Sequence, residues 1–167
     1  FKTELDENLR MIEDSVKFLK SKGKEVIYDA EHFFDGYAHN KEYALKSLGA
    51  AFDAGASVLV LCDTNGGALP SRVLEVVREV HSQLSAPLGI HTHNDAGFGI
   101  ANAVAAVQAG AVQVQGTVNG IGERCGNCDL IAVIATLQLK FKWQCLDAVL
   151  FKELTELSRF ANKVGKM

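Results

Sequence analysis

Two stretches of the sequence, AAFDAGASVLV at residues 50–60 and AAVQAGAVQVQ at residues 105–115, share one layout: a helix end, a glycine and a short apolar run. Recurrence of this kind indicates stacked strand–helix units rather than separate domains. The first stretch continues as SVLVLCDT at 57–64, an unbroken apolar run of the type found in parallel strands buried on both faces. The sequence therefore predicts an α/β fold.

The rest of the chain follows the same alternation. Leucine, isoleucine and valine at spacings of three and four predict an amphipathic first helix. Asn40 is expected to cap the second helix, which Gly55 closes. In chain order, the expected elements are a helix at 4–22 starting at Thr3 and Asp6, a strand at 25–33, a helix from Asn40 to Gly55, a strand at 57–64, a helix carrying Val73, Val77, Val80 and Leu84, a strand at 87–93, a helix at 100–109, a strand at 112–120, a helix at 130–139 and a last helix at 148–163.

Four βα units of roughly 25 to 32 residues fit either an open doubly wound sheet or part of an eight-stranded barrel. The length of 167 residues favours the open sheet. Polar side chains favour the barrel, because an open sheet builds its site at one switch point whereas four strand ends converge only on a curved wall. Such side chains end every expected strand: Glu31, then Asp63 and Thr64, then His91 and His93, then Asn119. We interpret residues 1–167 as one fragment, the second half (strands 5–8) of a TIM (β/α)8 barrel with a C-terminal helix.

The composition and charge of the chain limit the classes of molecule that it is expected to bind. The formal net charge is −3 with no cluster of lysine and arginine, which argues against nucleic acid and anionic lipid and favours a small molecule. The uncharged stretch at 96–122 is interrupted by asparagine and glutamine and broken by Gly110, so no membrane span is expected. The first residues lack the order of a signal peptide, and the four cysteines are read as thiols of a cytoplasmic protein.

The stretch IHTHND at 90–95 places two imidazoles two residues apart. In a strand, residues i and i+2 face the same side, so His91 and His93 form a candidate chelating pair. Nearby Asn94, Asp95 and Asn127 favour a mixed nitrogen and oxygen site. The alternative is two histidines hydrogen-bonded to loop backbone, and the spacing alone leaves both interpretations open.

The stretch NGIGERCGNCDL at 119–130 places glycines around Glu123 and Arg124 directly after a strand. Glycine lets the backbone approach a ligand closely while the two charged side chains offer contacts. A tight strand-to-helix turn explains the same glycines, so the loop alone does not decide its role.

Four motifs together resemble a known family: YDAEHFFDGY (28–37), LCDTNGG (61–67), HTHNDAGFGIANAVAAVQAGA (91–111) and GTVNGIGERCGN (116–127). They are similar to the acyl-CoA-condensing barrel family that contains 2-isopropylmalate synthase, homocitrate synthase, citramalate synthase and, more distantly, hydroxymethylglutaryl-CoA lyase. The resemblance covers about residues 1–140 in the same order. Within the family, IYDAEHFFDGY, GERCGN and LQLK most resemble the bacterial (R)-citramalate synthase branch.

The resemblance implies a divalent metal (Mn, Mg, Zn or Co) held by His91, His93 and Asn127. It implies a Claisen condensation of acetyl-CoA with a 2-oxo acid, pyruvate first, in isoleucine or leucine biosynthesis. Glu31 would transfer the proton of the acetyl methyl group, Thr64 would bind the keto-acid carboxylate, and Glu123 and Arg124 would contact substrate. The family's remaining ligand, an aspartate preceded by a catalytic arginine on the first strand, has no counterpart in this chain, which is therefore expected to be inactive alone.

Two secondary expectations remain. Asp63 and Asp95 could accept hydrogen bonds from metal-bound imidazoles, or could cap helices. Cys125 and Cys128 form a single CxxC, a weak signal for redox or zinc chemistry.

Besides an enzyme fragment, the chain could be a non-catalytic metal-binding or assembly module. A half-barrel exposes two strand edges and apolar wall residues such as Val58, Val60 and Ile90. We expect it to pair with the missing N-terminal half-barrel or to form a homodimer.

Overall fold

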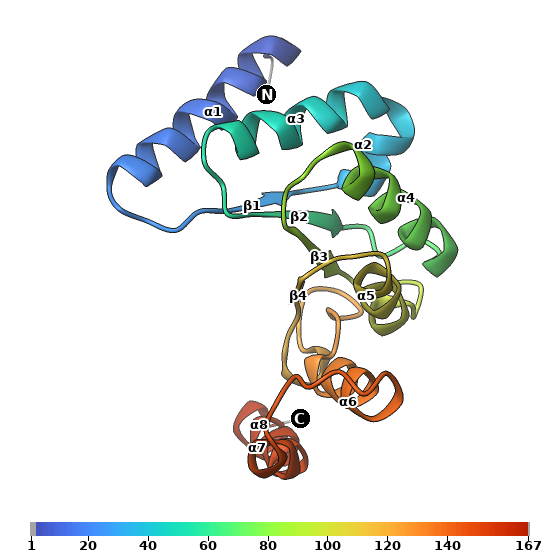
Figure 1. Cartoon of the computed structure of the whole chain (residues 1–167). Helices are drawn as coiled ribbons and strands as arrows, with labels where there is room; N and C mark the ends of the chain where they lie inside the picture. The colour runs from blue at the N-terminus through green and yellow to red at the C-terminus, as the bar shows by residue number, and fades with distance from the viewer. Residues whose placement is uncertain (1–2, 167) are drawn as a thin grey trace.

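The computed structural model describes residues 3–166 as one parallel sheet with helices packed along it (Figure 1). The strand order is β1-β2-β3-β4, so neighbours in sequence are neighbours in space. The strands are β1 (Ile27–Ala30), β2 (Val58–Asp63), β3 (Leu88–Thr92) and β4 (Gln113–Gln115). The helices are α1 (Leu5–Ser21), α2 (Phe33–His39), α3 (Lys41–Asp53), α4 (Pro70–Gln83), α5 (Gly99–Gln108), the 3-10 turn η1 (Val118–Gly120), α6 (Leu130–Lys140), α7 (Ala148–Lys152) and α8 (Leu154–Gly165). Across residues 3–166, every helix is too short or too polar to cross a bilayer.

Local sequence signals explain the helix ends. The side chain of Asn40 accepts a hydrogen bond from the backbone N–H of Tyr43 at 3.1 Å and caps α3, as predicted. Gly55 then leaves α3 with a φ of +107°, a conformation that favours glycine. Asp129 caps α6 in the same way through the N–H of Ile131. Thr3 does not cap α1, because Glu4 holds that position without a side-chain bond.

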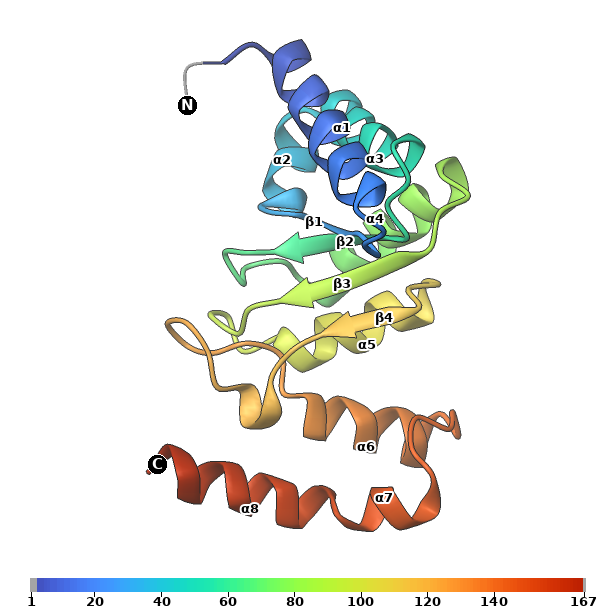
Figure 2. The same cartoon turned by 90° about the vertical axis from the view of Figure 1, so that its left-hand side faces the viewer.

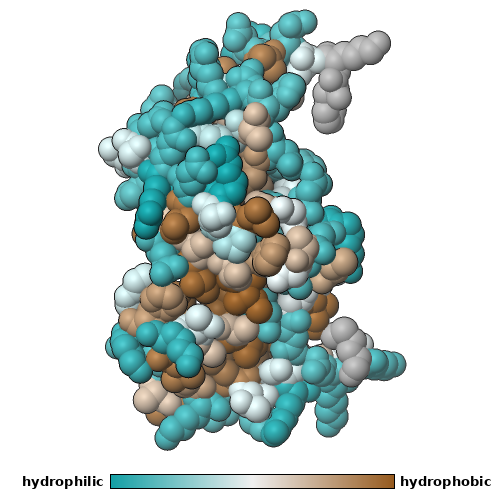
Figure 3. Space-filling model, turned by 90° about the vertical axis from the view of Figure 1, so that its right-hand side faces the viewer, coloured by the Kyte–Doolittle hydropathy of each residue, from teal (hydrophilic) through white to brown (hydrophobic). Residues whose placement is uncertain are grey.

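The core lies between the sheet and its helices. Leu59, Leu61, Leu88 and Ile90 are fully or almost fully buried and belong to one apolar cluster with the inward faces of α4 and α5. Both faces of β2 are shielded, which agrees with its unbroken apolar sequence. The helices that pack on the sheet form an outer layer, and apolar side chains gather near the middle of the surface of this layer (Figure 3).

Two of the three wall residues expected to be exposed are buried. Ile90 faces the helices rather than the inside of the sheet and has no exposed surface. Val60 faces the inside and is also fully buried; its Cγ2 lies over Gly89, where a Cβ would be 2.9 Å from it. Val58 alone is half-buried. The exposure prediction was therefore wrong for Val60 and Ile90.

The sheet is strongly curved. Nε2 of Gln115 in β4 donates a hydrogen bond of 2.9 Å to Oδ1 of Asp29 in β1, although β2 and β3 lie between them. In a flat sheet, these edge strands would be about 14 Å apart, three spacings of about 4.8 Å, which is more than one side-chain hydrogen bond can span. The strands therefore enclose a concave face, seen in Figure 2 in front of α4 and α5. This half-closed wall confirms the predicted partial barrel over the open sheet.

Three elements differ from the prediction. The first strand ends at Ala30, and His32, in a left-handed conformation with φ of 56°, turns the chain into the unexpected helix α2. The fourth strand contains only Gln113–Gln115. The predicted last helix is interrupted at Glu153 and forms α7 and α8.

Candidate metal centre

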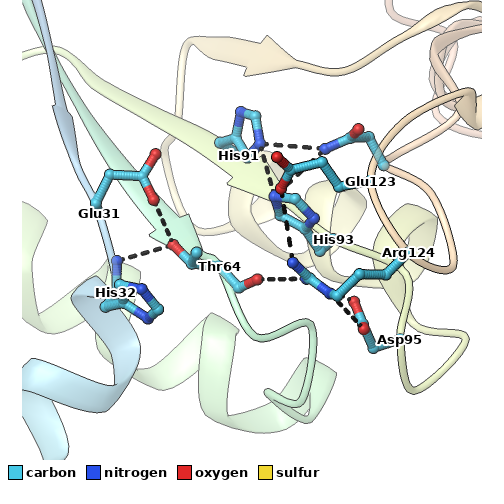
Figure 4. Close-up of polar contacts among 9 residues, drawn as sticks. Glu31, His32, Thr64, His91, His93, Asp95, Glu123 and Arg124 are labelled. Atoms are coloured by element: carbon cyan, nitrogen blue, oxygen red, sulfur yellow. Dashed lines mark hydrogen bonds and ion pairs between the residues drawn. The ribbon is translucent and has the colours of Figure 1, made fainter.

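The two histidines of the strand end lie side by side. His91 belongs to β3 and His93 follows the last strand residue, Thr92. Their ring centroids are 5.2 Å apart and their Nε2 atoms are 3.4 Å apart. Figure 4 shows both rings facing the same region as Glu31 and Thr64, as the i, i+2 spacing predicts.

The glycine-rich loop brings Asn127 beside these rings. Asn127 forms an antiparallel bridge with His93, fixed by hydrogen bonds of 2.9 Å from Asn94 N to Gly126 O and from Cys128 N to Thr92 O. The loop can return this way because Gly126 adopts a φ of +97°. Nδ2 of Asn127 lies 3.3 Å from Nε2 of His91 and 3.5 Å from Nε2 of His93.

These three atoms fit a metal ion. They form a nearly equilateral triangle with edges of 3.3, 3.4 and 3.5 Å. The mean edge sets a lower limit of about 2.0 Å on the distance from one ion to all three atoms, which is compatible with bonds of about 2.0 to 2.1 Å to zinc or magnesium. The amide of Asn127 must rotate to present Oδ1, and oxygen and nitrogen of an amide are interchangeable in such assignments. Within residues 3–166, no third histidine, cysteine, aspartate or glutamate joins the group.

The histidines differ on their other ring nitrogens. Nδ1 of His91 lies 3.0 Å from Oε1 of Gln115, its register partner in β4. Nδ1 of His93 is buried and has no hydrogen-bond partner among the described residues. Burial, then the charge of Arg124 and the neighbouring His91, lower the pKa of His93. Its imidazole is thus kept neutral, the form that binds metals.

Glu31 and Thr64 form a polar pair at the ends of β1 and β2. The Thr64 hydroxyl donates to Oε2 of Glu31 at 2.9 Å and accepts from the backbone N–H of His32 at 2.8 Å. The ring of His32 lies outside this pair and near Asp35, with Nδ1 3.9 Å from a carboxylate oxygen. Glu31 is exposed on the concave side, where a substrate can reach it.

Arg124 connects the loop to two strand ends. Its Nε and Nη2 donate to the two carboxylate oxygens of Asp95 at 2.8 and 2.9 Å, and Nη2 also donates to the carbonyl of Thr64 at 2.7 Å. This pairing lowers the pKa of Asp95 and raises that of Arg124. The carboxylate of Glu123 lies 3.7 Å from Arg124 and is largely exposed.

Asp63 and Asp95 were expected either to orient the histidines or to cap helices, and they do neither. Asp63 turns away from the rings and accepts from the backbone N–H of Ala68 at 3.3 Å and from Asn102 at 3.2 Å. Asp95 is bonded to Arg124. The first turn of α5 is instead closed by Asn94, whose Oδ1 accepts from Gly99 N at 3.0 Å. These outcomes follow from direction: Asp63 alternates to the helix side of β2, and Asp95 lies in the loop beyond β3.

Asp29 and Gln115 are contacts of this centre that the sequence interpretation missed. The available signal was strand alternation, which places Gln115 on the same side as its neighbour His91.

The four cysteines are unpaired, and none belongs to a group of three or more potential metal ligands within residues 3–166. Cys62, Cys125, Cys128 and Cys145 all carry free thiols. Burial raises the pKa of Cys128 to about 11, far from the range of a reactive thiolate.

The sequence model of one protein family, described as HMGL-like, matches residues 1–161, a range that includes the curved sheet, the paired histidines and the loop that carries Asn127. The chain belongs to the HMGL-like family.

The chain is 52% identical over 163 residues to an (R)-citramalate synthase of Geobacter sulfurreducens, covering 98% of this chain and 31% of that protein. It is 36% identical over 124 residues to a 2-isopropylmalate synthase of Methanocaldococcus jannaschii, covering 74% and 23%. The structure of an HMG-CoA lyase of Bacillus subtilis superposes with a TM-score of 0.81 at 20% identity, covering 96% of this chain and 56% of that one, which supports the shared fold. The chain thus spans between about a quarter and a third of the length of these curated synthases.

Proposed function

We propose that this chain is the metal-holding half of an enzyme that condenses acetyl-CoA with a 2-oxo acid, and that the acid is pyruvate and the product citramalate. The observation that carries the proposal is the meeting of the His91, His93 and Asn127 side chains at one point. The higher identity to a citramalate synthase than to a 2-isopropylmalate synthase favours pyruvate over larger 2-oxo acids.

His91 and His93 through Nε2, and Asn127 through its amide oxygen, would hold a divalent ion of manganese, magnesium, zinc or cobalt. When bound, such an ion supplies Lewis-acid polarisation of a carbonyl group and a template for substrate. The 2-oxo acid would bind on the concave side of the sheet, where Glu31 and Thr64 lie (Figure 4).

Glu31 is the proposed base. Its carboxylate takes a proton from the methyl group of acetyl-CoA, and the resulting carbon nucleophile forms a bond to the ketone carbon of the 2-oxo acid as the C=O π bond opens. The alkoxide formed in this way takes up one proton, which balances the proton that Glu31 removed, and becomes the hydroxyl of the product. Water then hydrolyses the thioester, which releases the thiol of coenzyme A and leaves a new carboxylate. The Thr64 hydroxyl orients Glu31 in the free protein and is placed to donate to the carboxylate of the 2-oxo acid instead.

Glu123 and Arg124 are proposed substrate contacts at the rim. Arg124 is held by Asp95, so it presents a fixed positive charge close to Thr64. Glu123 is largely exposed, and its one ion pair among residues 3–166 is with Arg124 at 3.7 Å.

An assembly role is the second candidate, and the open edges favour it. Within the described chain, β1 and β4 each pair with a single strand, which leaves backbone groups unpaired. A groove of about 320 Å³ runs beside β1 and is lined by Met11, Leu19 and Ile27. We propose that another half-barrel covers this edge, either the N-terminal half of a longer protein or a second copy.

The free thiols fit a cytoplasmic location.

The test is release of free thiol from acetyl-CoA by the intact protein with pyruvate and, in parallel, with 2-oxoisovalerate. We expect turnover with pyruvate and a loss of at least about 100-fold in Glu31→Gln, since general bases contribute about that much or more. The 167-residue chain alone should show none. Equal or better turnover with 2-oxoisovalerate would show that pyruvate is not the preferred substrate. Turnover that does not depend on a divalent metal would rule out the proposed role of His91, His93 and Asn127 as metal ligands.

A further inference from the structure

Gln115 stands between a candidate metal ligand and a carboxylate on the far side of the concave face. Its Oε1 lies 3.0 Å from Nδ1 of His91, and its Nε2 lies 2.9 Å from Oδ1 of Asp29. The three residues come from β3, β4 and β1, so the contact chain exists only because the sheet curves.

The donor and acceptor roles along this chain are fixed by chemistry. An ionised carboxylate only accepts hydrogen bonds, so Asp29 must face the NH2 group of Gln115. The carbonyl oxygen of Gln115 is thereby turned towards His91. A carbonyl also only accepts, so the proton of the neutral His91 ring must sit on Nδ1, which leaves the lone pair on Nε2.

We propose that Gln115, oriented by Asp29, is a positioning residue that selects the Nδ1–H tautomer of His91 and aims its Nε2 lone pair at the metal position. The inference rests on the proposed function for its metal, but the tautomer itself is a property of the metal-free protein. Partners of this kind on the outer nitrogen of a metal-bound histidine fix ring orientation and raise its basicity.

His93 supplies the internal contrast. Its Nδ1 has no partner among the described residues, so nothing comparable selects its tautomer. His91 is then the ligand prepared before metal arrives, whereas His93 must adopt the matching tautomer on binding.

Gln113 provides a matched control. It lies two residues before Gln115 in the same strand and on the same side, but its Oε1 is buried and has no hydrogen-bond partner among the described residues. Gln113→Leu removes the same group from the same strand, so general damage to β4 should affect both variants alike.

The experiment uses the intact protein with histidine labelled by 15N. In the metal-free wild type at neutral pH, we expect the His91 spectrum of an Nδ1–H ring. Gln115→Leu and Asp29→Asn should shift it towards a mixture of tautomers, because the acceptor is lost in one and the glutamine can turn over in the other. Gln113→Leu should keep the wild-type pattern.

Calorimetric titration with Mn2+ alone gives the second readout. We expect Gln115→Leu to bind about 10- to 100-fold more weakly than wild type. The double variant Gln115→Glu with Asp29→Asn should recover most of this loss, because the glutamate accepts from Nδ1 and the asparagine donates to the glutamate.

Two results would overturn the proposal: an unchanged His91 tautomer in Gln115→Leu, or Mn2+ affinity equal to that of Gln113→Leu. The wild type could bind no metal while the His91 tautomer still changes in Gln115→Leu. That pair of results would reject the metal role in the proposed function but support the positioning role of Gln115.

Discussion

The side chain of Asn127 occupies space that is open only because residue 122 is glycine. A Cβ at Gly122 would overlap Oδ1 of Asn127 and lie 2.7 Å from its Cγ. The loop residue that supplies the third candidate ligand is therefore placed by a missing side chain five residues earlier, so its position can be tested without touching any ligand.

Gly122→Ala should push the Asn127 amide away from the two histidines. Because the backbone of Gly122 is not in the left-handed region, the added methyl group acts through this overlap rather than through backbone strain. We expect Mn2+ affinity, measured by calorimetry, to fall at least about tenfold. The control is Gly67→Ala, where an added Cβ would meet no atom within 4 Å. Equal affinities in the two variants would show that Asn127 does not hold the ion.

Leu61→Ala should be strongly destabilising. Leu61 faces the helices from the centre of β2 and has no exposed surface, so truncation leaves a cavity that the tightly packed core cannot fill. We expect the free energy of unfolding in urea to fall by about 2 to 5 kcal/mol. Leu139→Ala, at a half-exposed position near the end of α6, should change it by less than about 0.5 kcal/mol. Similar losses in both variants would contradict the assignment of the core to this face.

Asp63 should make stability depend on pH. Burial raises the pKa of its carboxyl above the unfolded value of about 3.9. The folded protein then keeps a proton that the unfolded chain has released, so this contribution to stability is complete below the unfolded pKa and is lost as pH rises through the folded pKa. Asp63→Asn lacks that loss. Its free energy of unfolding minus that of wild type should therefore increase from about pH 4 to about pH 7 in urea titrations. A difference that is flat or decreases with pH would contradict a pKa of Asp63 that burial raises despite its hydrogen bonds.

The sequence was sufficient where one residue decides the local structure. Asn40, Gly55 and the apolar run of β2 predicted their elements because capping, left-handed turns and two-sided burial leave clear patterns. The pairing of His91 with His93 followed from strand alternation alone. These features depend on near neighbours in the chain.

What the sequence did not predict depends on distant contacts. The ion pair of Arg124 with Asp95 joins residues 29 apart in sequence, and the hydrogen bond of Gln115 with Asp29 joins residues 86 apart. The left-handed turn at His32 that begins α2 lies beside the backbone contact with Thr64 and has no glycine to signal it. Such contacts are fixed by the curvature of the sheet, which a periodicity argument does not contain.

The contact between η1 and α8 should stabilise the loop that carries Arg124 and Asn127. Asn119 has a left-handed φ of 61°, and its amide donates to the carbonyl of Ser158 at 2.9 Å and to Oδ1 of Asn162 at 2.8 Å. Asn119→Gly keeps the backbone conformation and should lose about 1 kcal/mol per hydrogen bond at most.

Asn119→Ala should cost about 1 kcal/mol more, because alanine disfavours the left-handed region. Urea denaturation and the rate of proteolysis between α6 and α8 provide the two measurements. If glycine and alanine variants are equally stable, the backbone conformation at 119 carries no strain.

The last prediction is that the 167-residue chain self-associates. Its edge strand β1 carries Ile27 half-exposed beside a groove with Met11 and Leu19, and the opposite edge at β4 is also unpaired within the described residues. Pairing both edges of one copy with those of another would complete a closed wall with twofold symmetry. Sedimentation at micromolar concentration should show a dimer, and Ile27→Lys should shift it to monomer because a charge would be buried at the new interface. Ser82→Lys, at an exposed position near the end of α4, which packs behind the sheet rather than at an open edge (Figure 2), should leave the dimer unchanged. A well-folded wild-type monomer with no concentration dependence would show that these edges need no partner.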